Sequence, residues 1–294
     1  EEYMGEFDYV DESLKQLKEV ADRHIKSGEF DADKLTEDFM NIDAFRDMKA
    51  YLQSEENQRE IQPFEALNQE FVSLHAQYKN SFEDMHRDAE QKAFRREYAS
   101  GCMSFHRGYY SPSHIDSIAQ GASRGHLLKR KGSRYTYEYV FDADDNLICV
   151  YGYGYHDKSR VPVTTELFVR KKDIVQSFVF ERDLNGRKIL DYISECRYKD
   201  GKIMEYRIAF CGLIDSESSA KRGKQCAEVD VEAYDYEGDA IKTFRWYRYL
   251  TSSKMLSADK FTFTRDESGK VLSFKSEPIK SYYKWAKENR EKQQ

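Results

Sequence analysis

The sequence predicts an α+β protein in which N-terminal helices pack on a large, twisted antiparallel sheet. Apolar residues recur every three or four positions over residues 1–105 and at every second position over residues 134–276. Short turns rich in Asp, Asn and Gly separate the segments of the second region, whereas parallel strands would need long crossovers. We therefore expect a helical region, a glycine-rich basic connector over 106–133, an antiparallel meander and a closing helix over 277–294.

Helices are expected throughout residues 1–105. The first begins after Asp11, and a second spans residues 33–52, where Asp43 would cap a new start. The third begins at Pro63, because proline favours the first position of a helix. Its apolar residues keep helical spacing over about seven turns, so we expect one long helix whose stripe packs on the sheet. The stripe consists of Phe64, Leu67, Phe71, Leu74, Tyr78, Phe82, Met85 and Ala89.

About ten strands are expected after the connector, because aromatic and β-branched residues alternate there with polar ones. Turns such as Asn185-Gly186 and Asp200-Gly201 readily adopt the positive φ of two-residue hairpins. A helix that opens at Pro278 is expected to close the fold. The alternative architecture is a closed β-barrel, since ten meander strands could curl around a cavity. The expected strands are 134–141, 147–155, 163–170, 173–182, 188–198, 202–212, 228–236, 240–250, 258–265 and 270–276.

Several of the expected hairpins share one pattern. Segments 139–148, 180–189, 234–241 and 263–272 each join an aromatic strand end to an acidic turn and then to a basic or apolar restart. This pattern resembles the hairpin unit of YD (Rhs-like) repeats and other bacterial β-meander repeats. The resemblance implies an antiparallel meander and assigns no site residues.

Composition bounds the compartment and the cofactors. The chain of 294 residues has a net charge of −6 and five cysteines. No apolar run approaches the ~18 residues of a membrane helix, so no membrane span is expected. The odd cysteine count without a Cys-x-x-Cys pair favours free core cysteines, a reducing compartment and no metal or other cofactor. A cytoplasmic location is favoured; because the chain starts at Glu1, a processed secreted or lipid-anchored form stays open.

Catalytic motifs are incomplete in this sequence. His86-Arg87-Asp88 resembles the start of a kinase catalytic loop but lacks the Asn and the Asp-Phe-Gly that should follow. We therefore expect no catalytic residue. A hydrolytic or metal site, as the alternative, would fall in the connector, where His114 and Asp116 could supply two ligands or a base with its orienting carboxylate. The candidates for such an enzyme are His106, His114, Asp116, His126 and His156.

Charge is unevenly distributed along the chain. Residues 1–105 contain 25 acidic and 13 basic side chains, a net charge of −12, and the remainder contains 28 and 34, a net charge of +6. The connector ends in a basic patch, which could meet phosphates while ring faces of the sheet stack on bases. The overall negative charge makes nucleic acid an unfavourable partner. The basic patch consists of Arg124, Lys129, Arg130, Lys131 and Arg134.

The missing catalytic motifs and the acidic helices favour a non-enzymatic protein-binding module over an enzyme. Its expected partner is a protein with a basic surface, which the acidic helices would steer electrostatically. In general character the sequence is similar to bacterial immunity proteins that neutralise polymorphic toxins, and this similarity implies sequestration of a toxin domain. The alternatives are a small-ligand-binding barrel, a hydrolase or metal site in residues 106–126, and a nucleic-acid-binding sheet.

Overall fold

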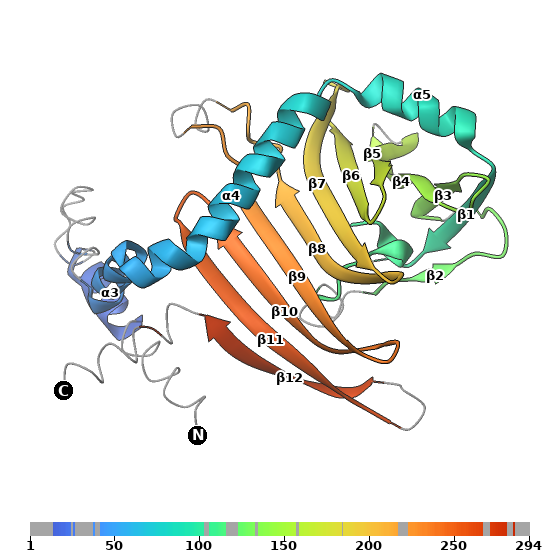
Figure 1. Ribbon diagram of the computed structural model, residues 1–294. Coiled ribbons are helices and arrows are strands. Elements are labelled where there is room, and N and C mark those ends of the chain that lie inside the picture. Colours follow the sequence, from blue (N-terminus) through green and yellow to red (C-terminus); the bar gives the residue numbers. More distant parts are fainter. Residues whose placement is uncertain are drawn as a thin grey trace.

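The computed structural model describes residues 14–24, 26, 38, 42–102, 106–115, 123–132, 135–156, 159–183, 185–216, 223–266, 271–280 and 285. These residues form a twelve-stranded antiparallel sheet crossed by helices (Figure 1). Helices α3 (Asp43–Gln53), α4 (Glu55–Tyr78) and α5 (Phe82–Lys92) come first, and residues 14–24 are also helical. None of the described helices is both long and apolar enough to span a membrane.

The strands follow one another across the sheet almost in chain order, β12-β11-β10-β9-β8-β7-β6-β5-β4-β3-β1-β2. They are β1 (Arg95–Ser100), β2 (His126–Leu127), β3 (Tyr137–Phe141), β4 (Leu147–His156), β5 (Ser159–Lys171), β6 (Ile174–Arg182), β7 (Lys188–Lys199), β8 (Lys202–Phe210), β9 (Glu228–Glu237), β10 (Ala240–Leu250), β11 (Met255–Arg265) and β12 (Val271–Lys280). Strands β3 to β12 confirm the ten predicted strands, with ends shifted by a few residues. The sheet is open, with β12 and β2 at its edges, so the closed-barrel alternative is wrong.

Three predictions about element boundaries are wrong. Residues 95–100 form β1, not helix, because they pair with β3 from Arg95 opposite Phe141 to Ala99 opposite Tyr137. Pro278 lies inside β12 opposite Asp259 and does not open a helix; this edge strand tolerates a proline. Helix α3 begins at Asp43 itself, with Ile42 at the N-cap position. Of the predicted closing helix beyond β12, only position 285 is described, and it is helical.

The long predicted helix is two helices. Helix α4 begins eight residues before Pro63, at Glu55, because the Ser54 hydroxyl caps it by accepting from the Asn57 amide at 3.2 Å. The turn at residues 79–81 then separates α4 from α5. The apolar stripe continues across this break, and all eight of its residues pack in the main core, as predicted.

The two faces of the sheet are covered differently. We call the face that carries Phe178, Ile193 and Ala209 the helix face, because α4 and α5 pack on it. Tyr78 of α4 contacts Phe178 with ring centroids 4.1 Å apart.

Three of the free cysteines lie in this core and a fourth lies in the core of the opposite face. This placement confirms the prediction that these cysteines act as small hydrophobes.

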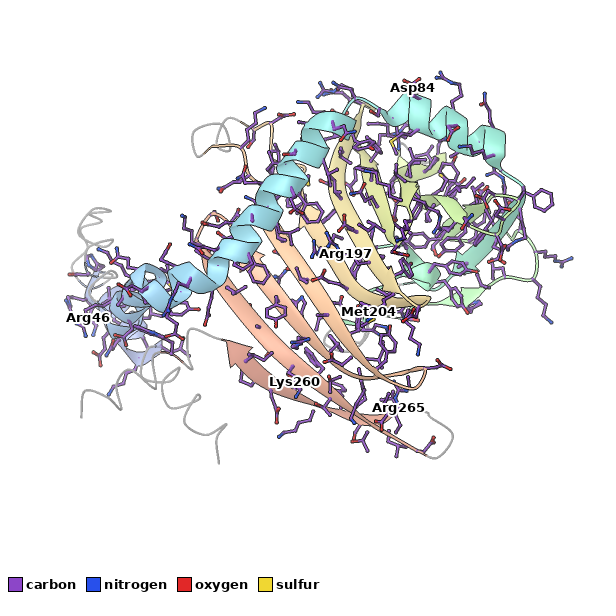
Figure 2. The ribbon with its side chains drawn as sticks, in the orientation of Figure 1. Arg46, Asp84, Arg197, Met204, Lys260 and Arg265 are labelled. Carbon is purple, nitrogen blue, oxygen red and sulfur yellow. The ribbon has the colours of Figure 1, made fainter. Side chains whose placement is uncertain are left out.

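Helix α4 crosses the helix face as a diagonal strip, so part of that face stays uncovered (Figure 1). Arg197 on β7 and Lys260 on β11 lie outside this strip (Figure 2). Polar side chains replace apolar ones there: the Arg197 Nε donates to the Glu195 Oε1 at 2.6 Å. The strand positions on one face are therefore apolar under the helix and charged beyond it.

The opposite face, which we call the connector face, carries Glu166, Ser177, Tyr206 and Glu232. Residues 106–115 of the connector lie on it and include a short 3₁₀ helix, η1 (Gly108–Tyr110). A side chain at Gly108 would meet the Tyr137 ring at 2.7 Å, so this close approach requires glycine. Residues 106–115 of the connector thus cover part of the second face of the sheet.

Candidate functional site

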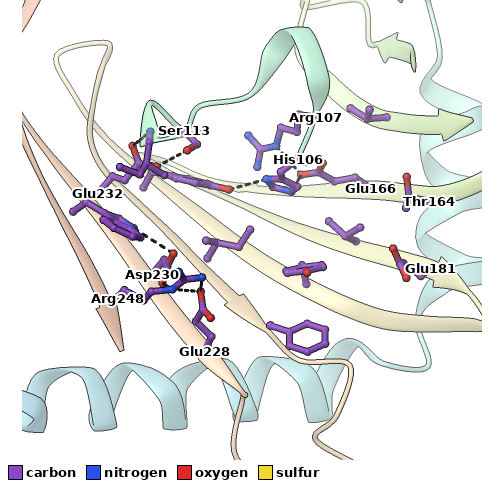
Figure 3. Close-up of a pocket in the computed structure, with 18 of the residues that line it drawn as sticks. His106, Arg107, Ser113, Thr164, Glu166, Glu181, Glu228, Asp230, Glu232 and Arg248 are labelled. Atoms are coloured by element: carbon purple, nitrogen blue, oxygen red, sulfur yellow. Dashed lines mark hydrogen bonds and ion pairs between the residues drawn. The ribbon is translucent and has the colours of Figure 1, made fainter. Parts of the chain in front are cut away.

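A cavity of about 470 Å³ lies on the connector face, between the sheet and residues 106–115 of the connector (Figure 3). Its size is within the range of small-molecule sites. Strands β3 to β10 and the connector supply its lining. The cavity therefore brings together residues that are up to 142 positions apart, from His106 to Arg248.

Antiparallel register arranges the cavity floor in rows that run across the strands. One row contains Val179, Tyr192, Phe210 and Glu228 on β6, β7, β8 and β9. The next row contains Ser177, Ser194, Ile208, Asp230 and Arg248, and a third contains Cys196, Tyr206, Glu232 and Trp246. The rings of Tyr192, Phe210 and Tyr206 lie on the middle strands β7 and β8, and the acidic side chains of these three rows all lie on β9.

Arg107 fastens the connector to the sheet from a fully buried position. Its Nε donates to the Glu166 Oε1 at 2.6 Å, and its Nη2 donates to the hydroxyls of Ser177 at 3.0 Å and Ser194 at 2.9 Å. The guanidinium also lies over the Phe168 ring, 4.8 Å from its centroid. Burial alone would raise the pKa of Glu166, but Arg107 and His106 lower it to about 2. Glu166 is therefore a charged member of a buried ion pair.

His106 lies beside this pair at the wall of the cavity. Its Nδ1 shares a 2.7 Å hydrogen bond with the Tyr206 hydroxyl, and its Nε2 lies 3.0 Å from the Glu166 Oε1. Both contacts hold the imidazole between β5 and β8. His106 thus lines the cavity with its ring position set by two strands.

Glu232 is the second buried anchor of the connector. Its carboxylate accepts from the Ser113 hydroxyl at 2.5 Å, the His114 amide at 2.8 Å and the Tyr234 hydroxyl at 2.8 Å. These hydrogen bonds favour the charged form, but burial outweighs them and raises the pKa of Glu232. The connector is therefore tied to β9 at one end and to β5, β6 and β7 at the other.

The β9 end of the cavity has more acid than base. Arg248 donates from Nε and Nη2 to the Glu228 Oε1 at 2.7 and 2.5 Å. Asp230 accepts only the Trp246 indole N–H at 3.2 Å on its Oδ2; among the described residues its buried Oδ1 has no hydrogen-bond partner, and the Arg248 Nε lies 3.8 Å away. Burial and the neighbouring Glu228 raise the pKa of Asp230 well above its usual value.

Two acidic side chains lie near the β6 end of the cavity, and of these only Glu181 belongs to the lining. Glu181 lines it, is exposed at its rim, and makes no hydrogen bond or ion pair with the described residues. Asp191 occupies a β-bulge of β7, between residues paired with Phe180 and Val179. Burial, and then the nearby Glu181, raise the pKa of Asp191 to about 7.

The candidate catalytic residues have separate surroundings in the structure. His106 lines the cavity; the His114 ring packs on Tyr234 and Phe244, and burial followed by the charge of Arg124 lowers the pKa of His114 to about 4. His126 is exposed on β2. Asp116 and the side chain of His156 lie outside the described residues. In the part of the chain that the structure describes, no group of three His, Cys, Asp or Glu side chains is placed to hold a metal.

The predicted basic patch is divided between two environments. Arg124 donates to the carbonyls of Ser111 and Ser113 and so braces the connector. Lys129, Arg130 and Lys131 are exposed, and the Lys131 ammonium lies over two rings, those of Tyr98 and Tyr135. Arg134 lies outside the described residues.

Comparison with known proteins assigns no family. No family model and no curated protein matches this chain. Among solved structures, it is similar to a protein of unknown function from Bacteroides fragilis, with 8% sequence identity and a TM-score of 0.32. That match covers 49% of this chain and 91% of the other chain. These comparisons therefore assign no function to this chain.

Most residues of the cavity were not candidates in the sequence analysis. Arg107 stands next to His106, and Glu166, Asp230 and Glu232 lie within predicted strands. One signal was available in β9, whose Glu228-Val-Asp-Val-Glu232 places three carboxylates on one face of an interior strand. Acidic residues at alternate positions of a central strand indicate either an exposed face or a polar site.

Proposed function

We propose that this chain is a non-enzymatic binding protein whose cavity on the connector face receives a cationic group of its ligand. Among the described lining residues, five are carboxylates and only two are arginines. Arg107 pairs with Glu166, and Arg248 pairs with Glu228. The remaining acidic residues of the lining are Glu181, Asp230 and Glu232.

The observation that carries this proposal is the environment of Asp230. Its Oδ1 is buried at the cavity without a hydrogen-bond partner among the described residues; the Arg248 guanidinium lies 3.8 Å away and donates its hydrogen bonds to Glu228 instead. A buried carboxylate oxygen in this state is costly, and a bound cation would supply the missing donor and favour the charged form. Trp246, which donates to the other oxygen, and Tyr192 present rings to the same cavity, and ring faces attract cations.

The contacts of the histidines support a binding role over a catalytic one. His106 is held by Tyr206 and Glu166, and the backbone of His114 is tied to Glu232. Each contact fastens the connector to the sheet. The basic protein partner predicted from the sequence would fit the cavity through one Lys or Arg side chain, and the immunity-type role remains a prediction from sequence character.

Titration with small cations tests the proposal. Butylammonium and methylguanidinium should change the fluorescence of Trp246 and bind with a Kd of about 10 mM or tighter by calorimetry. Asp230→Asn should weaken both by about tenfold, since a charged hydrogen bond contributes roughly 1.5–3 kcal/mol. The matched control is Asp235→Asn, the same change at an exposed residue of the same strand, outside the cavity lining. Absence of binding, or equal loss in both variants, would overturn the proposal.

A further inference from the structure

Two of the five cysteines contact each other. The Sγ atoms of Cys211 and Cys226 lie 3.7 Å apart, and both residues are fully buried in the core that α4 covers. Both thiols are free in the structure. We infer that this pair is a modification site, which forms a disulfide when the chain folds in an oxidising environment and stays a dithiol in a reducing one. Neither cysteine lines the cavity, so the inference does not depend on the proposed function.

The ends of β8 and β9 place the two cysteines next to each other. Phe210 of β8 pairs with Glu228 of β9, and the Phe210 carbonyl accepts from the Ala227 amide at 2.9 Å. Cys211 and Cys226 are the next residues on the two segments, one step beyond this hydrogen bond. Residues that face each other across antiparallel segments have Cα atoms about 4.5–5.5 Å apart, which is within the range that a disulfide bridges.

Backbone hydrogen bonds hold each cysteine independently of the other. The Cys211 amide donates to the Asp191 carbonyl of β7 at 2.6 Å, and the Cys226 amide donates to the Asn68 Oδ1 of α4 at 2.9 Å. A disulfide requires the two sulfur atoms to be about 2 Å apart. Rotation about χ1 moves each Sγ while its backbone stays in place. We therefore expect the bond to form without loss of these backbone contacts.

The surroundings favour formation of the bond during folding over oxidation of the folded protein. Leu67 and Phe71 of α4 belong to the same buried cluster as the two cysteines. The hydrogen bond with Cys226, and then burial, raise the pKa of Cys211 well above its usual value, so little of the reactive thiolate is present in the folded protein. In the unfolded chain both thiols are accessible to an oxidant, and folding brings them together.

A metal site explains this pair less well. Zinc takes four ligands, and the described residues contain no group of three or more His, Cys, Asp or Glu side chains placed to hold a metal. Cys102 and Cys196 have other partners: the Cys102 thiol lies 3.9 Å from the Ser100 carbonyl, and the Cys196 Sγ lies 3.8 Å from the Arg107 Nη1. The contact between Cys211 and Cys226 is therefore the one that predicts a disulfide.

Oxidised glutathione, a small disulfide, supplies the oxidising equivalents in the test. The thiolate of one cysteine attacks a glutathione sulfur, forms a mixed disulfide and releases one glutathione thiolate. The thiolate of the second cysteine attacks the cysteine sulfur of the mixed disulfide, closes the bond between Cys211 and Cys226 and releases the second glutathione. The pair loses two electrons and two protons, which leave with two molecules of reduced glutathione.

Refolding in two redox buffers tests the inference. The full chain is reduced and unfolded in urea, refolded with either dithiothreitol or a mixture of reduced and oxidised glutathione, and then alkylated with N-ethylmaleimide in urea. Trypsin cleaves after Lys224, between the two cysteines. Mass spectrometry should therefore detect peptides 208–221 and 225–242 joined by a disulfide in the glutathione sample only. The other three cysteines should be alkylated in both samples.

The disulfide should also stabilise the fold, because it closes the loop over residues 211–226 in the unfolded chain. We expect the Tm to be about 5 °C higher in the glutathione sample than in the reduced one. Cys226→Ala should abolish this difference. The matched control is Cys149→Ala, which removes another fully buried thiol of the same core and should keep the difference. Each variant is compared with itself in the two buffers, so a loss of core packing cancels.

Three results would overturn the inference. The first is complete alkylation of Cys211 and Cys226 after refolding in the glutathione mixture. The second is a disulfide that joins either residue to a different cysteine. The third is a Tm difference between the buffers that persists in Cys226→Ala. The peptide map of the native chain requires no substitution, so it decides the matter even where a variant does not fold.

Discussion

Replacing Arg107 by methionine should lower the free energy of unfolding by about 3–5 kcal/mol at neutral pH, because it leaves the buried Glu166 carboxylate without its guanidinium partner and with only His106 beside it. Glu166 is 3% exposed and Arg107 6% exposed. The two serines that also accept from Arg107 lie 2.8 Å apart and can hydrogen-bond to each other, so Glu166 carries most of the penalty. The backbone φ of +58° at Arg107 is equally unfavourable for either residue and does not change the comparison.

The pH dependence of this loss distinguishes the buried ion pair from a packing defect. In the native protein the pKa of Glu166 is about 2, below its usual value, so the stability it contributes is present above about pH 4.5 and is lost as pH falls toward 2. In the Arg107→Met variant, burial without the guanidinium should raise the pKa of Glu166 instead. The free energy of unfolding of the variant then falls as pH rises above about 4.5. The difference in this free energy between the variant and the native protein should therefore grow from pH 5 to pH 7.5.

Urea unfolding followed by circular dichroism at these two pH values measures the difference. Arg182→Met, at an exposed arginine of β6, is the surface control and should stay within about 0.5 kcal/mol of the native protein. The double variant Arg107→Met with Glu166→Gln should recover part of the loss, since the unpaired charge is gone. Equal stability of the two arginine variants, or a loss that does not depend on pH, would refute the reasoning.

Two further predictions concern other parts of the fold. Because the pKa of Asp191 is raised to about 7, its contribution to stability is full below about pH 4 and is lost as pH rises through 7. Asp191→Asn should remove this decline and raise the free energy of unfolding by about 1–2 kcal/mol at pH 8, a value reduced because the side chain is partly exposed. Urea unfolding at pH 4.5 and pH 8 measures the difference. An unchanged pH profile would contradict this. Ser54→Ala should cost about 1 kcal/mol and lower the Tm by about 2–4 °C, because the cap of α4 is lost, whereas Ser73→Ala on the exposed side of α4 should be neutral.

The meander was predictable because its signals are local. Each strand is defined by alternation between neighbouring residues, and each turn by two or three residues; Asp200 and Gly201, for example, adopt φ values of +51° and +77°. The apolar stripe from Phe64 to Ala89 was predictable for the same reason, since residues three or four apart share a helix face. Its interruption after Tyr78 depends on the turn and not on the stripe.

The errors arose where pairing with a distant strand decided the conformation. Residues 95–100 have three charged side chains in six positions and no clear strand pattern; β3 recruits them to the sheet. Pro278 is a helix-start residue by propensity, but β11 holds it in an edge strand. Local preference is worth a few tenths of a kcal/mol per residue and yields to a ladder of hydrogen bonds.

The sequence alone determined the class of this protein, an α+β fold with an antiparallel meander, because periodicity is written in adjacent residues. Only the tertiary structure decided which charges are buried together. Arg107 meets Glu166 across 59 positions, and the amide of His114 meets Glu232 across 118. Whether a carboxylate is paired, solvated or left at a cavity depends on strand order and register, and these are properties of the folded chain and not of any segment of it.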